Sequence, residues 1–476
     1  MKRHIRHILP LLLASLILSA CGGQTVQDTN TSAEISADTT EAESYLPPEG
    51  DFGGAVFTIY GQSTDVRQNF WIEEVEGEVC NDAIHSRDLA VEERLNITLE
   101  YLAESDREVV TSTARSSILA GDEEYHLLIN ALSAGINHFT TAGVLYDLRQ
   151  IPHLTLDSQY WNKSMYDRMH FNGAQYFTTG PISYQYFMSP IVVRFNKRLT
   201  EEYQMGDIYG LVLDGKWTVD KLAELSKDKA IDLDNNGKMD INDFYGLALE
   251  GIIGTAFYTA AGFDTVSREN GNYSVTIGSA ASVDLIQKYA AFFADRNQYI
   301  FDDHSAQNLS NNLFSEGRAI FHPFTMLDTV TLRDMKDDFG IVPMPKYTEE
   351  QEKYHTACNT WYPTGVAVPL TCSDPERTGT VMENLAYYSY EIMTPAVYEI
   401  TLQGKVSRDD VSSRMLDIIY EELTFDFIST FNFVESERVL RSSVLGETEN
   451  FVSKWASIEA QVQAELDAVI SIADER

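Results

Sequence analysis

The hydrophobic and polar positions after residue 50 change repeatedly between the period of a strand and the period of a helix. Three apolar or alternating runs predict strands, at residues 55–60, 97–101 and 125–129. Residues 78–95 and 106–120 carry apolar side chains at helical spacing. This strand–helix–strand–helix–strand order implies right-handed crossovers and a parallel sheet that helices cover on both faces.

The residues that follow the predicted strands are the first candidates for a binding site. In parallel α/β sheets, small ligands bind beyond the carboxyl ends of the strands, where the strand order reverses. The residues in these positions are Gly61, Gln62, Ser63, Asn130 and Ser133.

Later segments continue the alternation and then become helical. Residues 176–196 are rich in β-forming residues and predict a crossing between two lobes, and residues 217–229 predict a helix with Thr218 as its N-cap. After about residue 373 the pattern is mostly helical. The last helix should bury one face, which carries Trp455, Ile458, Val462, Leu466 and Ile470.

The first 50 residues differ in composition from the rest. A basic start precedes residues 8–20, an apolar run of 13 residues that is too short to span a bilayer, so residues 1–20 are interpreted as a signal peptide. Residues 18–22 (LSACG) resemble the bacterial lipobox, which predicts that Cys21 is lipidated; the alternative is an ordinary cleavage site. Residues 21–50 predict a flexible tether, rich in Ser, Thr, Ala and acidic residues. We therefore expect a lipid-anchored protein on the outer, extracellular or periplasmic, face of a cell membrane.

The charge and the motifs of the chain exclude several classes of function. The formal net charge is −37, which argues against nucleic acid as a partner because phosphates would be repelled. Besides Cys21, the cysteines are Cys80, Cys358 and Cys372, without a CxxC pair, which favours buried thiols over a disulfide scaffold or zinc cluster. Residues 210–216 fit the start of a P-loop, but Trp217 stands where a hydroxyl is needed. No catalytic motif emerges, and the protein is expected not to be an enzyme.

Residues 232–243 (DLDNNGKMDIND) have the spacing of a calcium loop. Calcium takes six or more oxygen ligands, which such loops supply from positions 1, 3, 5, 7, 9 and 12, with glycine at position 6. Gly237 occupies the glycine position. The predicted ligands are Asp232, Asp234, Asn236, Lys238 through its carbonyl, Asp240 and Asp243. Only one such loop is present, and a predicted strand follows it rather than a helix. A structural calcium ion is therefore favoured over a sensor, with a hydrated acidic turn as the alternative.

Five short segments, together with the lipobox and tether, give the chain a family resemblance. The segments are residues 143–148 (GVLYDL), 193–199 (VRFNKRL), 216–222 (KWTVDKL), 314–321 (FSEGRAIF) and 339–345 (FGIVPMP). In this order they resemble the extracellular solute-binding lipoproteins of bacterial ABC importers, in the large cluster that includes the maltose- and oligosaccharide-binding proteins. The resemblance extends from about residue 51 to 370. The region 373–476 resembles the family only in being helical.

The resemblance implies an α/β, two-lobed clamp of the type II periplasmic-binding-protein fold. Each lobe would have a central, mostly parallel sheet flanked by helices, with a helical C-terminal extension. Residues 51–187 and 326–370 would form the N-terminal lobe, and residues 191–322 and 373–476 the C-terminal lobe. Ligand would lie in the cleft between them, and hinge closure would engage both lobes.

The resemblance also implies partners and a site. The expected partners are a small solute of the oligosaccharide class and ABC permease subunits, with the protein itself a monomer. Sugar recognition needs aromatic faces and short polar groups. Glu250 falls where relatives place a ligand-contacting acid, and the other cleft candidates are Tyr184, His322, Phe324, Trp361 and Tyr362, each with a core role as the alternative. The alternative functions are a surface sensor for a histidine kinase, a binder of a non-sugar solute, and a carbohydrate hydrolase.

Overall fold

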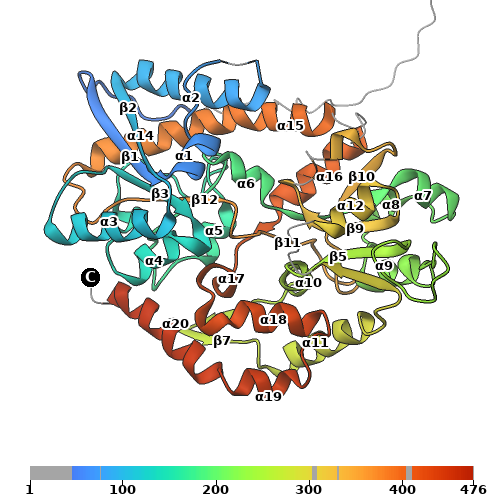
Figure 1. Ribbon diagram of the computed structural model, residues 1–476. Helices are drawn as coiled ribbons and strands as arrows, with labels where there is room; N and C mark the ends of the chain where they lie inside the picture. The colour runs from blue at the N-terminus through green and yellow to red at the C-terminus, as the bar shows by residue number, and fades with distance from the viewer. Residues whose placement is uncertain are drawn as a thin grey trace, which may run out of the picture. The chain divides into compact units, whose positions relative to one another are not determined.

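The computed structural model describes residues 45–75, 77–302, 308–327, 329, 332–403 and 410–474 (Figure 1). The predicted signal peptide, Cys21 and nearly all of the predicted tether lie outside the described residues. Pro47–Arg476 form one unit, and the description that follows concerns this unit alone. Among the described helices, none has both the length and the apolar character that a membrane crossing requires.

The first sheet contains the three strands that the pattern predicts. Its order is β12-β3-β1-β2. The strands are β1 (Ala55–Gln62), β2 (Ile97–Glu104), β3 (Leu127–Ala131) and β12 (Thr364–Ala367). β1 is parallel to both β2 and β3, while β12 is antiparallel to β3. The predicted parallel arrangement is therefore confirmed, with one antiparallel strand added at the edge.

The helices of this lobe are α1 (Ser63–Asn69), α2 (Val79–Leu95), α3 (Arg107–Ala120), α4 (Ile136–Thr141), α5 (Lys163–Arg168) and α6 (Tyr184–Met188). Three of them, α2, α3 and α5, begin at a residue whose side chain caps them. In α3, the Asp106 carboxylate accepts the Glu108 and Val109 N–H groups, and Gly121 ends the helix at φ +84°. The predicted β-rich stretch 176–196 is wrong in its middle, because α6 occupies it. Its residues Tyr186 and Phe187 are buried, so tertiary packing overrides their β propensity.

The second sheet is mixed and has the order β10-β4-β9-β5-β8. Its strands are β4 (Ile191–Asn196), β5 (Tyr245–Glu250), β8 (Tyr299–Asp302), β9 (Ala319–Thr325) and β10 (Phe339–Pro343). β5 is parallel to β8 and β9, whereas β4 is antiparallel to β9 and β10. The surrounding elements are α7 (Lys197–Glu202), α8 (Ile208–Leu213), α9 (Val219–Ser226), α10 (Ile253–Ala260), β6 (Val266–Glu269), β7 (Asn272–Val275), α11 (Ala280–Phe292) and α12 (Leu309–Ser315). The Thr218 side chain caps α9, as predicted.

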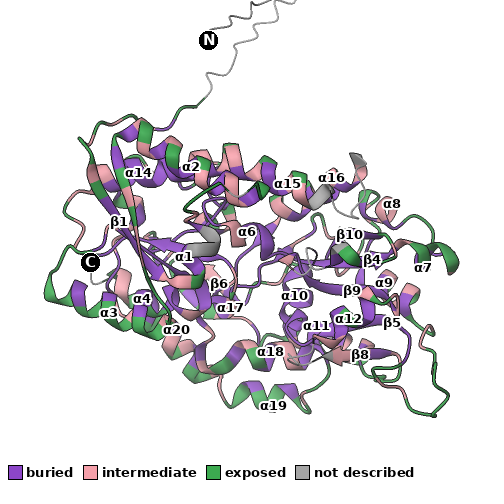
Figure 2. Ribbon diagram, turned by 45° about the horizontal axis from the view of Figure 1, so that its top comes forward, coloured by how far each residue is buried: buried purple, intermediate pink, exposed green. Residues whose placement is uncertain are grey.

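The C-terminal region is helical, as predicted. It comprises α14 (Pro375–Tyr388), a π-helical turn at Ser389–Met393, α15 (Thr394–Gln403), α16 (Asp410–Glu421), α17 (Phe427–Phe431), α18 (Ser436–Val444), α19 (Phe451–Ala456) and α20 (Glu459–Asp474). Trp455, Val462, Leu466 and Ile470 are buried and Ile458 is half-buried, so the predicted apolar face packs inward. A turn at residues 457–458 divides this face between α19 and α20, where the sequence predicts one helix. Figure 2 shows helices that are buried toward the sheets and exposed on their outer faces.

Two segments lie in other lobes than the family resemblance implies. β10, expected in the N-terminal lobe, is hydrogen bonded to β4 in the second sheet, because its five residues are all buried and extend that sheet. α14, expected in the C-terminal lobe, packs Val381 and Met382 into the same core as Phe57 of β1. The apolar faces of the two segments decide their lobes, and motif order alone does not show which partner each face meets.

A short parallel ribbon joins segments that are distant in the sequence. It pairs β11 (Thr356–Ala357) with β13 (Leu423–Thr424). In Figure 1, β11 lies between the two sheets, with α6, α15 and α16 on one side of it and α10, α17 and α18 on the other. Each of the two cavities described below borders this ribbon.

Candidate functional site

A polar cavity of about 270 Å³ lies beyond the carboxyl end of β5. It is bordered by α10, by the segment that follows β11, and by α17, α18 and the turn between them. Its polar lining residues are Thr255, Thr259, Asn359, Thr360, Thr424, Asp426, Ser429, Asn432, Glu435, Glu437, Arg438 and Arg441. Trp361 adds the one large aromatic side chain among the lining residues, and we call this the Trp361 cavity.

Trp361 is presented by a loop that the first sheet holds in place. The Ser133 N–H donates to the Thr360 carbonyl at 3.2 Å, and the Leu132 N–H donates to the Pro363 carbonyl at 3.3 Å. Within the loop, the Trp361 N–H donates to Asn359 Oδ1 at 3.2 Å. The Trp361 side chain is nevertheless 48% exposed. A large aromatic face is therefore available to a ligand in the cavity, and the predicted ligand contact of Trp361 stays a prediction.

The opposite wall is α10, which begins where β5 ends. Glu250 is the last residue of β5, is 2% exposed, and accepts the Ile252 N–H through Oε2 at 2.9 Å. Ile252 and Thr255 line the cavity, whereas Glu250 does not. The Thr255 hydroxyl contacts Glu437 Oε1 of α18 at 3.3 Å. Glu250 thus lies next to the cavity and shapes the start of the helix that lines it.

Close packing of α10 against α18 depends on a glycine. A Cβ atom on Gly254 would lie 2.3 Å from the Arg441 carbonyl oxygen, a separation that no real side chain adopts. Glycine allows the two helix backbones to meet at this point. The positions of Glu437 and Arg441 at the cavity follow from that contact.

The turn that leads into α18 has an unusual backbone. Asn432, Val434 and Glu435 have φ values of +46°, +52° and +54°. Left-handed backbone costs on the order of 1–3 kcal/mol at a β-branched residue such as Val434, and such conformations gather at functional sites. Asn432 and Glu435 both line the cavity.

Charged groups at the cavity pair largely with each other. Glu435 and Arg438 lie 2.5 Å apart, and Glu437 and Arg441 lie 3.7 Å apart. Asp426 caps α17 by accepting the Ser429 N–H at 3.0 Å. Two ion pairs leave Asp426 as the one acid of the lining without an ion-pair partner among these groups, and its carboxylate caps α17. Polar groups outnumber the unpaired charge, so the lining suits a ligand that carries hydroxyl groups.

The other predicted cleft residues at the ends of β1 and β3 do not line this cavity. Gln62 donates to the Ser105 carbonyl at 3.2 Å, and Ser63 begins α1. Asn130 is fully buried and accepts the Ala131 N–H at 2.9 Å. Ser133 is 7% exposed, and its N–H donates a backbone hydrogen bond to the carbonyl of Thr360, which lines the cavity. The structure thus brings Ser133 beside the Trp361 loop.

The remaining aromatic and histidine candidates are also absent from the lining. His322 is fully buried, its Nε2 lies 3.2 Å from the Ser310 hydroxyl, and its ring stacks on Phe324. Burial and the nearby Arg194 guanidinium hold the pKa of His322 well below its usual range, so the ring is neutral. Both residues belong to the core of the second sheet. Tyr184 begins α6, and Tyr362 follows Trp361 with its side chain half-buried.

Several side chains that line the cavity could not be found from the sequence. Asp426, Asn432, Glu435, Arg438 and Arg441 line the cavity from a region that resembles the family only in character. Their spacing follows no binding motif, and the left-handed backbone at Val434 and Glu435 has no sequence signal of the glycine kind.

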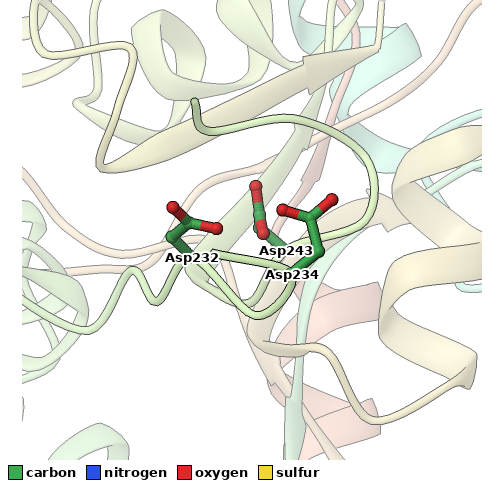
Figure 3. A group of neighbouring side chains, drawn as sticks. All are labelled: Asp232, Asp234 and Asp243. Atoms are coloured by element: carbon green, nitrogen blue, oxygen red, sulfur yellow. The ribbon is translucent and has the colours of Figure 1, made fainter. Parts of the chain in front are cut away.

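The predicted calcium loop forms a closed turn between α9 and β5. Ile231 and Phe244 exchange backbone hydrogen bonds of 2.9 and 3.1 Å at its base. Gly237 has φ +80°, as the sharp-turn position requires. Asp232, Asp234 and Asp243 place carboxylate oxygens within 4.8 Å of one another, and Figure 3 shows them side by side.

Backbone groups occupy some of the carboxylate oxygens in this loop. Asp243 is fully buried and accepts the Leu233 and Asp240 N–H groups at 2.9 and 2.7 Å. Asp232 accepts the Gly237 N–H at 2.8 Å. The side chains of Asn236 and Asp240 accept the Lys238 and Asn242 N–H groups. The loop therefore offers an all-oxygen donor set of three converging carboxylates, which fits a hard cation such as Ca²⁺.

Comparisons with known proteins agree on the fold. No family model and no curated protein matches the sequence. The structure matches a cyclo/maltodextrin-binding protein complexed with maltotetraose, with TM-score 0.56 and 11% identity over 89% of this chain and 97% of that one. It also matches an ABC substrate-binding protein from Listeria monocytogenes in complex with cycloalternan, with TM-score 0.52 and 13% identity over 87% of this chain and 99% of that one. The chain therefore has the two-lobed α/β fold of these binding proteins, and the predicted fold class is confirmed.

Proposed function

We propose that the protein is the substrate-binding component of an ABC importer, which captures a carbohydrate in the Trp361 cavity and delivers it to a permease. The observation that carries the proposal is an exposed tryptophan face above a polar cavity in which four of the five charged side chains form two ion pairs. Structural neighbours that bind maltotetraose and cycloalternan support the carbohydrate class.

The cavity offers both kinds of contact that a sugar needs. The apolar C–H face of a pyranose ring would stack on Trp361, and its hydroxyl groups would bond to Asn359, Ser429 and Asn432. Its volume of about 270 Å³ is below the range of about 300–1,000 Å³ of most ligand pockets. We therefore expect it to hold a short sugar, or one end of a longer one.

Binding at this site would couple the two lobes. The Trp361 loop is bonded to Leu132 and Ser133 beside the first sheet, whereas α10 extends from β5 of the second sheet. A ligand that contacts both favours the arrangement in which both contacts are made at once. The permease would then recognise the closed form.

Attachment to the membrane completes the proposed role. Lipidation of Cys21 and the polar tether of residues 21–50 would hold the body near a permease. Radiolabelled palmitate should enter the wild-type protein but not a Cys21→Ala variant when each is expressed in a bacterial host. Label in the variant would contradict the anchor.

We also propose that residues 232–243 hold a structural calcium ion. The three converging carboxylates, the glycine turn and the twelve-residue spacing support it. The loop lies between α9 and β5, so the ion would stabilise the entry into β5, an interior strand whose carboxyl end borders the cavity. It would have no part in ligand contact.

The deciding experiment is a calorimetric titration of the purified protein with malto-oligosaccharides, other oligosaccharides, peptides and polyamines, in the presence of calcium. Saturable binding of one sugar class, lost in Trp361→Ala, is the expected result. Binding of only peptides or polyamines would overturn the carbohydrate proposal. Chromatography of the same mixtures tests for catalysis, and release of a shortened sugar would show an enzyme instead.

A further inference from the structure

A second cavity, of about 620 Å³, borders the β11–β13 ribbon on the side away from the Trp361 cavity. It is lined by α5, α6, α15 and α16, whereas the Trp361 cavity is lined by α10, α17 and α18. The two cavities share the lining residue Thr424 of β13. In Figure 1, α6, α15 and α16 lie on one side of β11, and α10, α17 and α18 lie on the other. The volume is well within the range of small-molecule sites.

A continuous row of aromatic rings forms one wall of this second cavity. The rings of Tyr186 and Phe187 have centroids 5.4 Å apart, those of Phe187 and Tyr420 are 5.8 Å apart, and those of Tyr420 and Tyr398 are 5.8 Å apart. All four residues line the cavity. The Tyr420 hydroxyl donates to the Phe187 carbonyl at 2.8 Å, which fixes the middle of the row. The wall is thus ordered by packing and hydrogen bonding before any ligand arrives.

A fifth ring is contributed by an uncommon backbone element. Tyr390, which also lines the cavity, lies in the π-helical turn Ser389–Met393 that joins α14 to α15. Single π-helical turns are rare and occur frequently at functional sites. Here the turn sets the positions of Tyr390 and of Thr394 at the start of α15, which both face the cavity.

Acidic residues stand beside this aromatic wall on α16. Asp417, Tyr420 and Glu421 are three and four residues apart, so they share one face of the helix, and all three line the cavity. The Tyr398 hydroxyl donates to Asp417 Oδ1 at 3.4 Å. Burial and then the Asp417 charge raise the pKa of Tyr398, which is consistent with a negative potential at the wall.

The cations at the cavity are engaged by other acids. Lys163 pairs with Asp167 at 2.8 Å, Arg168 with Asp264 at 2.6 Å, and Lys353 with Glu422 at 2.7 Å. Within the part of the chain that the structure describes, no ion pair is found for Asp417 or Glu421. Lys353 also interacts with the charge of Glu421, although its ion pair is with Glu422. Because the lining holds four acids and three Lys and Arg residues, its net charge is negative, and Asp417 and Glu421 lie next to the aromatic rings.

We propose that this second cavity binds a small organic cation of the quaternary ammonium class. Aromatic faces attract such cations through their quadrupoles, and a methylated ammonium group loses less hydration than a bare ammonium when rings surround it. Asp417 and Glu421 supply the charge, and Tyr390, Tyr398 and Tyr420 supply the faces. This site is separate from the proposed sugar site, so either can fail without the other.

The test compares a cation with a neutral molecule of the same shape. Purified protein is titrated with choline and tetramethylammonium, and with 3,3-dimethyl-1-butanol, in which a carbon atom replaces the charged nitrogen of choline. Isothermal calorimetry and tyrosine fluorescence report binding. We expect the cations to bind and the neutral molecule to bind at least fivefold more weakly. Equal affinity of charged and neutral probes, or binding of neither, would overturn the proposal.

Charge-removing variants test whether choline binds in this cavity. Asp417→Asn combined with Glu421→Gln should weaken choline binding at least fivefold, because both side chains keep their shape and lose their charge. The matched control is Glu108→Gln combined with Asp122→Asn, which removes two exposed charges from the first lobe and should leave affinity unchanged. Unfolding temperatures of both double variants check that the fold is intact. Equal loss in the two variants would show only a general charge effect and would reject the site.

A second pair of variants tests the aromatic contribution. Tyr398→Phe keeps the ring and removes the hydroxyl, whereas Tyr398→Leu removes the ring. Choline affinity should be retained within about twofold in the first and fall several-fold in the second. Trp361→Ala should leave choline affinity unchanged. Loss of choline binding in Trp361→Ala would assign the cation to the other cavity.

Discussion

The acidic loop of residues 232–243 and the Trp361 cavity show two different ways in which a sequence builds a site. The loop takes all its candidate ligands from one stretch of twelve residues, and its turn is fixed by Gly237. The cavity takes its lining from α10, the Trp361 loop and α18, which are more than a hundred residues apart at the extremes. A local site can be read from spacing, whereas an assembled site depends on packing that spacing does not encode.

Removing the loop's carboxylates should produce the largest effect on stability. We expect Ca²⁺ at 100 times its dissociation constant to raise the free energy of unfolding by about 2.7 kcal/mol, because only the folded loop gathers the ligands. Asp232→Ala combined with Asp234→Ala should abolish this gain. Urea unfolding with calcium and with a chelator measures it.

The control for the calcium prediction is a pair of exposed acids outside the loop. Glu108→Gln combined with Asp122→Asn should keep the whole calcium response. An unchanged calcium response in the loop variant would leave a hydrated acidic turn as the better interpretation. The loop would then no longer be an example of a local metal site.

Gly254→Ala tests how far the assembled cavity depends on helix packing. In an isolated helix, alanine would be favoured over glycine by up to about 1 kcal/mol. Here the added Cβ would lie 2.3 Å from the Arg441 carbonyl oxygen, so α10 and α18 must separate. We expect a net loss of about 2 kcal/mol in the free energy of unfolding, together with weaker sugar binding. The sign of the change in the free energy of unfolding is the test. A variant more stable than the wild type would show that α10 and α18 do not meet this closely.

The same contrast explains what the sequence could predict. The strands β1, β2 and β3 and the helices α2 and α3 were readable because apolar periodicity is a local signal. The lobes to which β10 and α14 belong could not be predicted. The sequence shows that each segment has an apolar face, but it does not show which element that face packs against. His322 and Phe324 were placed near the cleft by family position, yet both pack inside the second sheet. The sequence named Trp361, which lines the cavity, but it did not name Glu435 and Arg438, because their place at the cavity depends on the left-handed turn before α18.

Trp361→Ala should weaken sugar binding by about tenfold to thirtyfold, which corresponds to about 1.4–2 kcal/mol. Little stability should be lost, because the side chain is already 48% exposed. Trp361→Phe is the matched control and should recover part of the affinity, since it restores a flat apolar face. Calorimetric titration and thermal unfolding give the two quantities. A large loss of stability with unchanged affinity would return Trp361 to the core and move the sugar site elsewhere.

Two buried carboxylates extend the comparison to pH. Asp243 of the acidic loop accepts two backbone N–H groups, whereas Asp65, at the first turn of α1, lies 3.6 Å from Arg107 Nη2. Burial raises the pKa of Asp65 from 3.8 to about 6, although the Arg107 charge and the Ala131 N–H lower it. A carboxyl group whose pKa is raised by folding binds its proton more tightly in the folded protein. Its contribution to stability is therefore fully present below pH 3.8 and is lost as the pH rises to about 6.

Asp65→Asn should remove this dependence. At pH 7 the variant should be more stable by about 1 kcal/mol, which is less than the raised pKa alone would give, because the Arg107 ion pair is lost as well. At pH 4 the two proteins should differ little, since Asp65 is then protonated and neutral in the fold. Urea unfolding across pH 4–7 measures the difference. Asp243→Asn, which keeps its shape but halves its acceptor capacity, should instead destabilise the protein at pH 7, and opposite signs for the two variants would show that hydrogen bonding rather than burial distinguishes the two acids.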